Sequence, residues 1–203
     1  KESPADRRSK AIDALLERPE FYDFWALKLA DVLRSNGRLI DPKGAYVFHR
    51  WIHSALESGM PMDRFVQTLL SADGSTFSNP ATNYYRISRE PEAAVETTAQ
   101  LFLGVRIQCA KCHNHPFEKW TQDDYYGFAA FFSQVGRKPG AIPGEEIVYG
   151  TGAGDVKQPR TGKVMPPKAL GGPVLDDAST DRRARLATWL TSKDNPFFGK
   201  ILV

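Results

Sequence analysis

Apolar positions recur at helical spacing from the start of the chain. Ser3 followed by Pro4 is typical of a helix N-cap and first turn, and the apolar stripe that follows is interrupted at Pro19. A second stripe covers residues 24–33, and we expect its helix to end near Asn36-Gly37. The pattern therefore predicts two consecutive helices before residue 38.

The same periodicity continues through the middle of the chain. It predicts helices over residues 46–56 and 61–70, and residues 71–90, which are polar and contain helix breakers, indicate a long ordered loop. Apolar periodicity resumes over 91–107 and leads directly into two cysteines. The strongly apolar stretch 123–135 predicts a sixth helix.

The helical periodicity ends after residue 135, and the composition changes. Glycine and proline crowd residues 136–173, which leaves room for at most a short hairpin around 145–150. A final helix is expected in TDRRARLATWLTS. The prediction is a mainly α, single-domain bundle of about six or seven helices. It comprises a core over 1–135, an irregular segment over 136–173 packed on that core, and a C-terminal helix with the start of a following region over 174–203.

Composition excludes several classes of protein. The 27 basic and 24 acidic residues give a net charge of +3, and the basic residues are scattered, so we expect no nucleic-acid partner. No apolar stretch approaches the roughly 20 residues of a membrane-spanning helix. The opening KESPADRRSK has no signal-peptide core, and the closing apolar run has no cap. We expect the chain to be a piece of a larger polypeptide.

The chemistry is concentrated in QCAKCHNHP at residues 108–116. This stretch holds both cysteines of the chain, Cys109 and Cys112, and two of its four histidines, His113 and His115. C-x-x-C-H is the pattern for covalent haem attachment. Two thiols three residues apart on one side of a turn can add to the two vinyl groups of one porphyrin, and His113 can then bind the iron. The motif predicts one covalent haem c, with the helices packed around it.

Three other uses of the motif compete with haem. A thioredoxin-like redox pair needs a βαβ setting, which the surrounding pattern does not offer. Zinc could take Cys109 and Cys112 with one or both of His113 and His115, although structural zinc sites usually gather two separated ligand pairs. A plain disulfide leaves the histidines unexplained.

A second axial ligand would have to come from elsewhere in the chain. His49 and His53 lie four residues apart and therefore on one side of the third predicted helix. His49 is the candidate distal ligand, since imidazole suits iron, whereas His53 is expected to be a surface or hydrogen-bonded histidine. Met165 offers a thioether instead, which would raise the reduction potential.

Other polar and aromatic residues have secondary roles in this prediction. His115 is expected to bind a haem propionate or to fix the turn at Pro116, and Asp123 and Asp124 are typical of a helix start. Basic residues that could neutralise propionates are Arg86, Arg89, Arg106 and Lys111. Aromatic residues that could stack on sugars, if exposed, are Tyr84, Tyr85 and Trp120, although packing in the core is expected of each.

TTAQLFLGVRIQCAKCHNHPFEKWTQDDYYGFAAFF closely resembles the core of the planctomycete cytochrome-type domain PSCyt2, also called DUF1549. PKGAYVFHRWI, NPATNYYRISREPE and PRTGKVMPPKALGGP are similar to the same family. The closing RRARLATWLTSKDNPFFGKILV resembles the start of a DUF1553 region. The resemblance implies a large exported bacterial protein, periplasmic or at the cell surface, often with another cytochrome-type domain, that binds haem c through Cys109, Cys112 and His113.

Electron transfer within a larger exported protein is the function we expect. The redox partner would be another protein or another cytochrome domain of the same polypeptide. A haem enzyme with an open sixth position, acting on peroxide or a small molecule, is one alternative. A zinc-braced structural or carbohydrate-binding module is the other.

Overall fold

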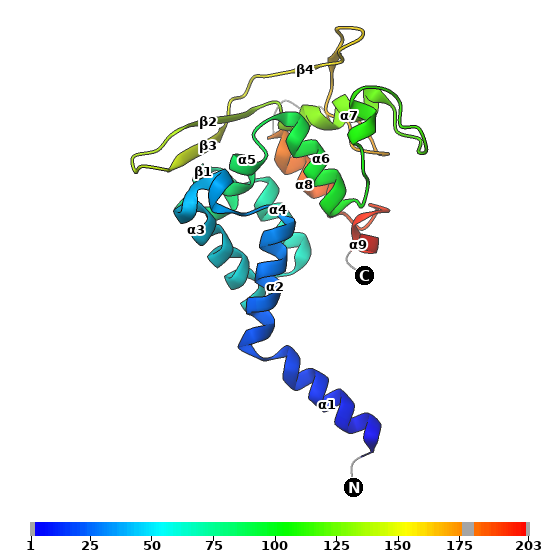
Figure 1. Cartoon of the computed structure of the whole chain (residues 1–203). Helices are drawn as coiled ribbons and strands as arrows, with labels where there is room; N and C mark the ends of the chain where they lie inside the picture. Colours follow the sequence, from blue (N-terminus) through cyan, green and yellow to red (C-terminus); the bar gives the residue numbers. More distant parts are fainter. Residues whose placement is uncertain (1–2, 176–180, 202–203) are drawn as a thin grey trace.

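The chain is mainly helical (Figure 1). The computed structural model describes residues 3–175 and 181–201. Within these residues there are nine α-helices rather than the expected six or seven, together with three short 3-10 helices. The α-helices are α1 (Pro4–Leu16), α2 (Pro19–Val32), α3 (Gly37–Glu57), α4 (Met62–Leu70), α5 (Asn83–Ile87), α6 (Pro91–Phe102), α7 (Gln122–Ala129), α8 (Arg182–Leu190) and α9 (Phe198–Ile201).

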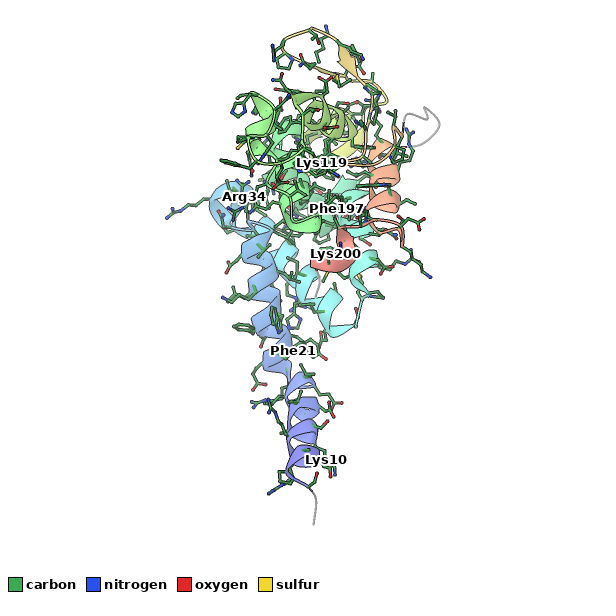
Figure 2. The ribbon with its side chains drawn as sticks, turned by 90° about the vertical axis from the view of Figure 1, so that its right-hand side faces the viewer. Lys10, Phe21, Arg34, Lys119, Phe197 and Lys200 are labelled. Carbon is green, nitrogen blue, oxygen red and sulfur yellow. The ribbon has the colours of Figure 1, made fainter. Side chains whose placement is uncertain are left out.

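The first helix begins as its sequence predicts and projects from the rest of the protein. The side chain of Ser3 accepts a hydrogen bond from the Asp6 N–H, and Asp6 bonds back to Ser3, which completes a capping box. Pro19 then starts α2 in its first turn. None of the α1 residues is buried, and Figure 2 shows Lys10 and Phe21 on the part of the chain that extends away from the body.

The third helix starts earlier than predicted. Asn36 follows the end of α2, as expected, but its side chain also accepts hydrogen bonds from the N–H groups of Arg38 and Leu39 and so caps α3. The helix is broken at Ile40 and Asp41, where Asp41 has φ 60° and ψ 161°. The stretch between the predicted helix end near Asn36-Gly37 and the predicted helix over 46–56 is therefore mostly helical, with a break inside α3 rather than a loop between helices.

The predicted loop over 71–90 is wrong in part, because it contains a buried helix. A 3-10 helix, η1 (Pro80–Thr82), runs into α5, and all five α5 residues are buried. The side-chain amide of Asn83 donates to the backbone oxygens of Thr76 (2.7 Å) and Pro80 (2.9 Å), which fixes the segment from within. Tyr84 and Tyr85 fill the interior, so they are not the exposed sugar-stacking residues considered above.

The short hairpin predicted in the Gly/Pro-rich segment is confirmed. β2 (Val135–Pro139) pairs antiparallel with β3 (Glu146–Gly150), and β1 (Gly74–Ser75) adds a third strand on the other edge of β3, with Gly74 opposite Val148. A second small sheet, which the sequence did not predict, pairs β4 (Val156–Lys157) with β5 (Val164–Met165).

The core is filled by side chains of α2 to α9, together with Val148 of β3. Trp51 lies between Phe48 and Phe65, with ring centroids 5.9 and 4.8 Å away, and Phe128 packs edge-on against Phe131. The helices therefore pack around side chains, and Cys109 and Cys112 lie at the surface. The mainly helical bundle is therefore confirmed, and the haem around which its helices were expected to pack stays a prediction.

The C-terminal part adds α8 and α9 to this core. The predicted final helix is present as α8, although Thr180, where we expected it to begin, lies outside the described residues, as do Leu202 and Val203 of the closing run. Over residues 3–175 and 181–201, no helix combines the length and apolar character needed to cross a bilayer, as predicted.

Candidate cofactor-attachment site

Both cysteines lie on the exposed side of one tight turn. A 3-10 helix, η2 (Gln108–Lys111), has Cys112 as its C-cap. With three residues per turn, side chains at i and i+3 eclipse each other. Ile107 and Ala110 are such a pair, both fully buried, and they anchor the turn in the core. Cys109 and Cys112 are the other pair, and both thiols are free and exposed on the same side.

The turn is held from behind by α7. The backbone oxygen of Lys111 accepts hydrogen bonds from Gln122 Nε2 (2.9 Å) and from the Tyr126 hydroxyl (3.1 Å). Gln122 Oε1 in turn accepts from Gln158 Nε2 at 3.0 Å, deep in the structure. Burial raises the pKa of Tyr126, and negative charge on Glu92 and on Cys112 adds to the effect. The hydroxyl therefore stays protonated and keeps donating to the turn.

The hydrogen bond of His113 fixes which ring nitrogen is free. Its Nδ1 lies 2.8 Å from the backbone oxygen of Asn114, and a carbonyl can only accept, so Nδ1 carries the proton. The neutral ring then has its lone pair on Nε2, and the side chain is exposed. Histidines that bind metals usually make this kind of backbone contact through the other nitrogen. Nε2 is therefore the nitrogen through which His113 could bind a metal.

His115 has the opposite arrangement. Its Nδ1 accepts hydrogen bonds from the N–H groups of Phe117 (3.2 Å) and Glu118 (3.0 Å), so the proton of the neutral ring is on Nε2. Its own N–H donates to the backbone oxygen of Trp120 at 2.8 Å. Of the two roles predicted for His115, the structure shows the turn-fixing one.

The candidate distal ligands do not gather at the motif. His49 and His53 belong to α3, which lies on the other side of α6 from the chain leading into α7 (Figure 1). His53 is 3.2 Å from Asp23 Oδ1 and 3.7 Å from Glu57 Oε2, which agrees with its expected hydrogen-bonded role. Met165 is only 7% exposed and packs in the core.

The zinc ligand set proposed from the sequence does not form in the part of the chain that the structure describes. There, no three side chains of His, Cys, Asp or Glu come together in a way that could hold a metal ion. Trp120 is buried, and its indole N–H donates to Glu118 Oε2 at 2.7 Å, so it presents no sugar-stacking face.

The proposed propionate partners divide into two groups. Arg86 and Arg89 are bound to carboxylates beside the β2–β3 hairpin. Arg106 precedes the motif and Lys111 lies between its two cysteines; both are exposed, so they remain available to an anionic group there.

Comparison with known proteins identifies the family. A family profile described as "PSCyt2: Protein of unknown function (DUF1549)" matches residues 1–137, about two thirds of the chain. The chain belongs to the PSCyt2 family. No curated protein and no solved structure matches it. The PSCyt2 match spans α1 to α7 and the whole attachment motif.

Sequence reasoning missed the residues that support the PSCyt2 motif. Asn114 Oδ1 accepts from the Gln122 N–H at 3.1 Å, and Gln122 and Tyr126 hold Lys111 as described. The sequence did mark the start of α7, because Thr121 and Asp124 have capping-box spacing and form that box in the structure. Nothing in the spacing shows that the same helix would face the cysteines.

Acid should weaken this end of α7 in the PSCyt2 chain. Burial tends to raise the pKa of Asp124, but hydrogen bonds from Lys168 Nζ (2.8 Å) and from Thr121 lower it below its ordinary value. Because the unfolded pKa is about 3.9, the stability contributed by Asp124 is fully present above about pH 4 and is lost as pH falls through the lower folded pKa. Urea unfolding between about pH 2 and 7 measures this effect. As the pH falls, the free energy of unfolding should decrease less for Asp124→Asn than for the unmodified chain.

The matched control for this experiment is the exposed neighbour Asp123. Asp123→Asn should keep the acid dependence of the unmodified chain. If Asp124→Asn also keeps it, Asp124 does not couple α7 to pH.

Proposed function

We propose that this chain carries one haem c, attached through Cys109 and Cys112 with His113 as the proximal iron ligand, and that it transfers electrons within a larger exported protein or to a redox partner. When bound, haem supplies reversible one-electron chemistry at its iron. The single observation that carries the proposal is the pair of free, exposed thiols on one side of η2, followed by a histidine with Nε2 unengaged.

The donor set and its surroundings fit such a group. The thiols can each form one thioether bond without rearrangement of the core, because Ile107 and Ala110 hold the turn from the opposite side. Phe117, in the loop just after the motif, is 91% exposed and offers apolar surface of the kind a porphyrin edge needs. Arg106 and Lys111 supply positive charge nearby.

Intact mass tests the attachment directly. After expression with a haem-attachment system in an exported form, the chain should gain the mass of one haem, and Cys109→Ser/Cys112→Ser should gain none. His113→Ala should keep the added mass but change the visible spectrum, because it removes only the iron ligand. His53→Ala is the matched histidine control and should leave mass and spectrum unchanged. An unmodified mass in correctly exported protein would contradict the proposal.

A haem with an open sixth position is a second candidate, because His49 and His53 lie on α3, on the other side of α6 from the motif, and Met165 is buried in the core. The reduced spectrum separates the two candidates. Sharp, low-spin bands that carbon monoxide does not change favour electron transfer with a bound sixth ligand. A high-spin spectrum that shifts with carbon monoxide favours binding or turnover of a small molecule.

A further inference from the structure

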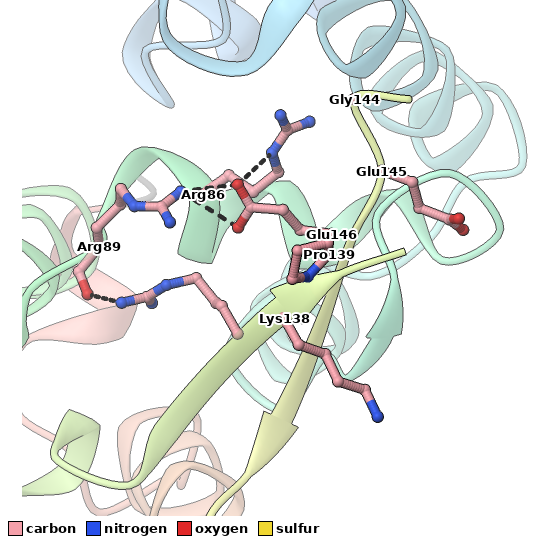
Figure 3. A pocket seen from close by; sticks show the side chains of 8 residues that line it. Arg86, Arg89, Lys138, Pro139, Gly144, Glu145 and Glu146 are labelled. Atoms are coloured by element: carbon pink, nitrogen blue, oxygen red, sulfur yellow. Dashed lines mark hydrogen bonds and ion pairs between the residues drawn. The ribbon is translucent and has the colours of Figure 1, made fainter. Parts of the chain in front are cut away.

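A second site with its own chemistry lies beside the β2–β3 hairpin. Here a pocket of about 270 Å³ opens between the hairpin and the end of α5. Three arginines line it, Arg86, Arg89 and Arg137. Figure 3 shows Arg86 and Arg89 directed at Glu146, while Glu145 and Lys138 point away from them.

Arg86 is fixed in place but not fully satisfied. Its side chain is 8% exposed, and Nη1 binds Asp41 Oδ2 at 2.9 Å. Its Nε has no hydrogen-bond partner, since Glu146 Oε1 is 3.6 Å away, beyond hydrogen-bond range. A buried guanidinium N–H without an acceptor costs free energy. The N–H of Arg86 Nε is therefore a donor at the pocket wall that a bound ligand could satisfy.

Arg137 is held at the pocket by backbone oxygens rather than by a carboxylate. Its guanidinium donates to two backbone oxygens, those of Tyr85 (3.3 Å) and Arg89, and it forms no ion pair with any described residue. Burial and the nearby charge of Arg89 lower the pKa of Arg137, and the more distant carboxylates of Glu146 and Glu90 offset only part of that shift. The pocket wall therefore presents two guanidinium groups without a full set of partners of their own, Arg86 with an unbonded Nε and Arg137 with no carboxylate of the described residues at ion-pair distance.

The backbone at Asp41, Gly44 and Gly144 lies close to the Arg86–Asp41 ion pair. Asp41, with φ 60° and ψ 161°, occupies a region that is nearly restricted to glycine, and such strain tends to occur at functional sites. A Cβ on Gly44 would lie 2.7 Å from Arg86 Nη1, and one on Gly144 would lie 3.3 Å from Asp41 Oδ2. Gly44 therefore leaves room for the Arg86 guanidinium, and Gly144 leaves room for the Asp41 carboxylate that binds it.

We propose that this pocket binds a small oxyanion, such as a carboxylate or a phosphate group, with Arg137 supplying the charge and Arg86 Nε a hydrogen bond. Guanidinium groups suit such anions in charge and planar geometry. The volume is just below the usual range for ligand pockets, which limits the ligand to one anionic group and a few carbon atoms. The site is separate from the cysteine motif and does not depend on haem binding.

Calorimetric titration of the full chain tests the proposal, with inorganic phosphate and acetate as separate probes at constant ionic strength. At least one probe should bind saturably. Arg137→Gln should weaken it about tenfold or more, the worth of one charged hydrogen bond. Arg50→Gln, at an exposed arginine on α3, is the matched control and should leave the affinity unchanged.

Glu146→Gln separates binding from a purely structural ion-pair network. It removes a competing negative charge, so it should tighten oxyanion binding, whereas a structural network would give no binding to tighten. This variant also decides the matter if Arg137→Gln fails to fold by circular dichroism. Absence of saturable binding by both probes, equal affinity for Arg137→Gln, or weaker affinity for Glu146→Gln would each overturn the proposal. Preference for one probe identifies the class of anion.

Discussion

Asp181→Asn is expected to lower the free energy of unfolding by about 3 kcal/mol, because it leaves Arg183 buried without a counter-charge. The Arg183 side chain is 3% exposed and lies 2.6 Å from Asp181 Oδ2. Its Nη1 donates to the buried backbone oxygen of Ala72 at 2.8 Å, and its guanidinium lies 5.1 Å from the ring centroid of Tyr85. Breaking a buried ion pair usually costs more than this, but Asp181 itself is 38% exposed, so solvent screens part of the interaction.

Companion variants separate the charge from the cap. Asp181 also accepts from the Arg183 N–H as the N-cap of α8, a role that asparagine can keep and alanine cannot. Asp181→Ala should therefore cost about 1 kcal/mol more than Asp181→Asn. Adding Arg183→Met to Asp181→Asn should recover part of the loss, because no buried charge remains.

Urea unfolding at neutral pH measures all three variants. The control is Asp155→Asn, which removes a carboxylate that is 53% exposed and 3.8 Å from Arg182, so it should cost less than about 1 kcal/mol. If Asp181→Asn costs no more than this control, the buried pair does not stabilise the fold as argued.

The helices that the sequence predicted are those with a local start signal and a regular apolar stripe. Ser3, Pro19 and Thr121 each start a helix by chemistry contained within a few residues. The hairpin was likewise predictable, since glycine and proline flank a short β-prone run.

The elements that escaped prediction depend on tertiary contacts. α5 is five residues long and is stable because its side chains are buried and Asn83 bonds to Thr76, which no periodicity within the segment can show. The break in α3 is similar, because the strained Asp41 is held by Arg86, a residue 45 positions away.

The residues of the candidate attachment site also fall into two groups, those that the motif marks in the sequence and those that only packing brings to it. Cys109, Cys112 and His113 stand out in the sequence because a chemical spacing defines them, and their use in haem attachment stays a prediction. The support from Gln122 and Tyr126 depends on how α7 packs against η2. The surface position of the motif also follows from packing, since Ile107 and Ala110 turn inward and leave the thiols outside.

Asp41→Ala is expected to lower the free energy of unfolding by about 3 kcal/mol, since it takes the nearest carboxylate from the buried Arg86. Glu146 Oε1 remains 3.6 Å from Arg86 Nε, which keeps the loss at the low end. The carboxylate also accepts from the Gly44 N–H at 2.9 Å. Burial tends to raise the pKa of Asp41, but these two partners lower it below its ordinary value, so the group is ionised at neutral pH.

Asp41→Gly tests the backbone separately from the charge. Glycine also removes the carboxylate, but it adopts φ 60° and ψ 161° without strain, so it should be less destabilising than alanine by about 1 kcal/mol. Asp73→Ala, at an exposed aspartate, is the control and should stay within about 0.5 kcal/mol of the unmodified chain. Equal losses for alanine and glycine in urea unfolding would mean that residue 41 is not strained. In that case, the ion pair with Arg86 would be its only contribution to the fold.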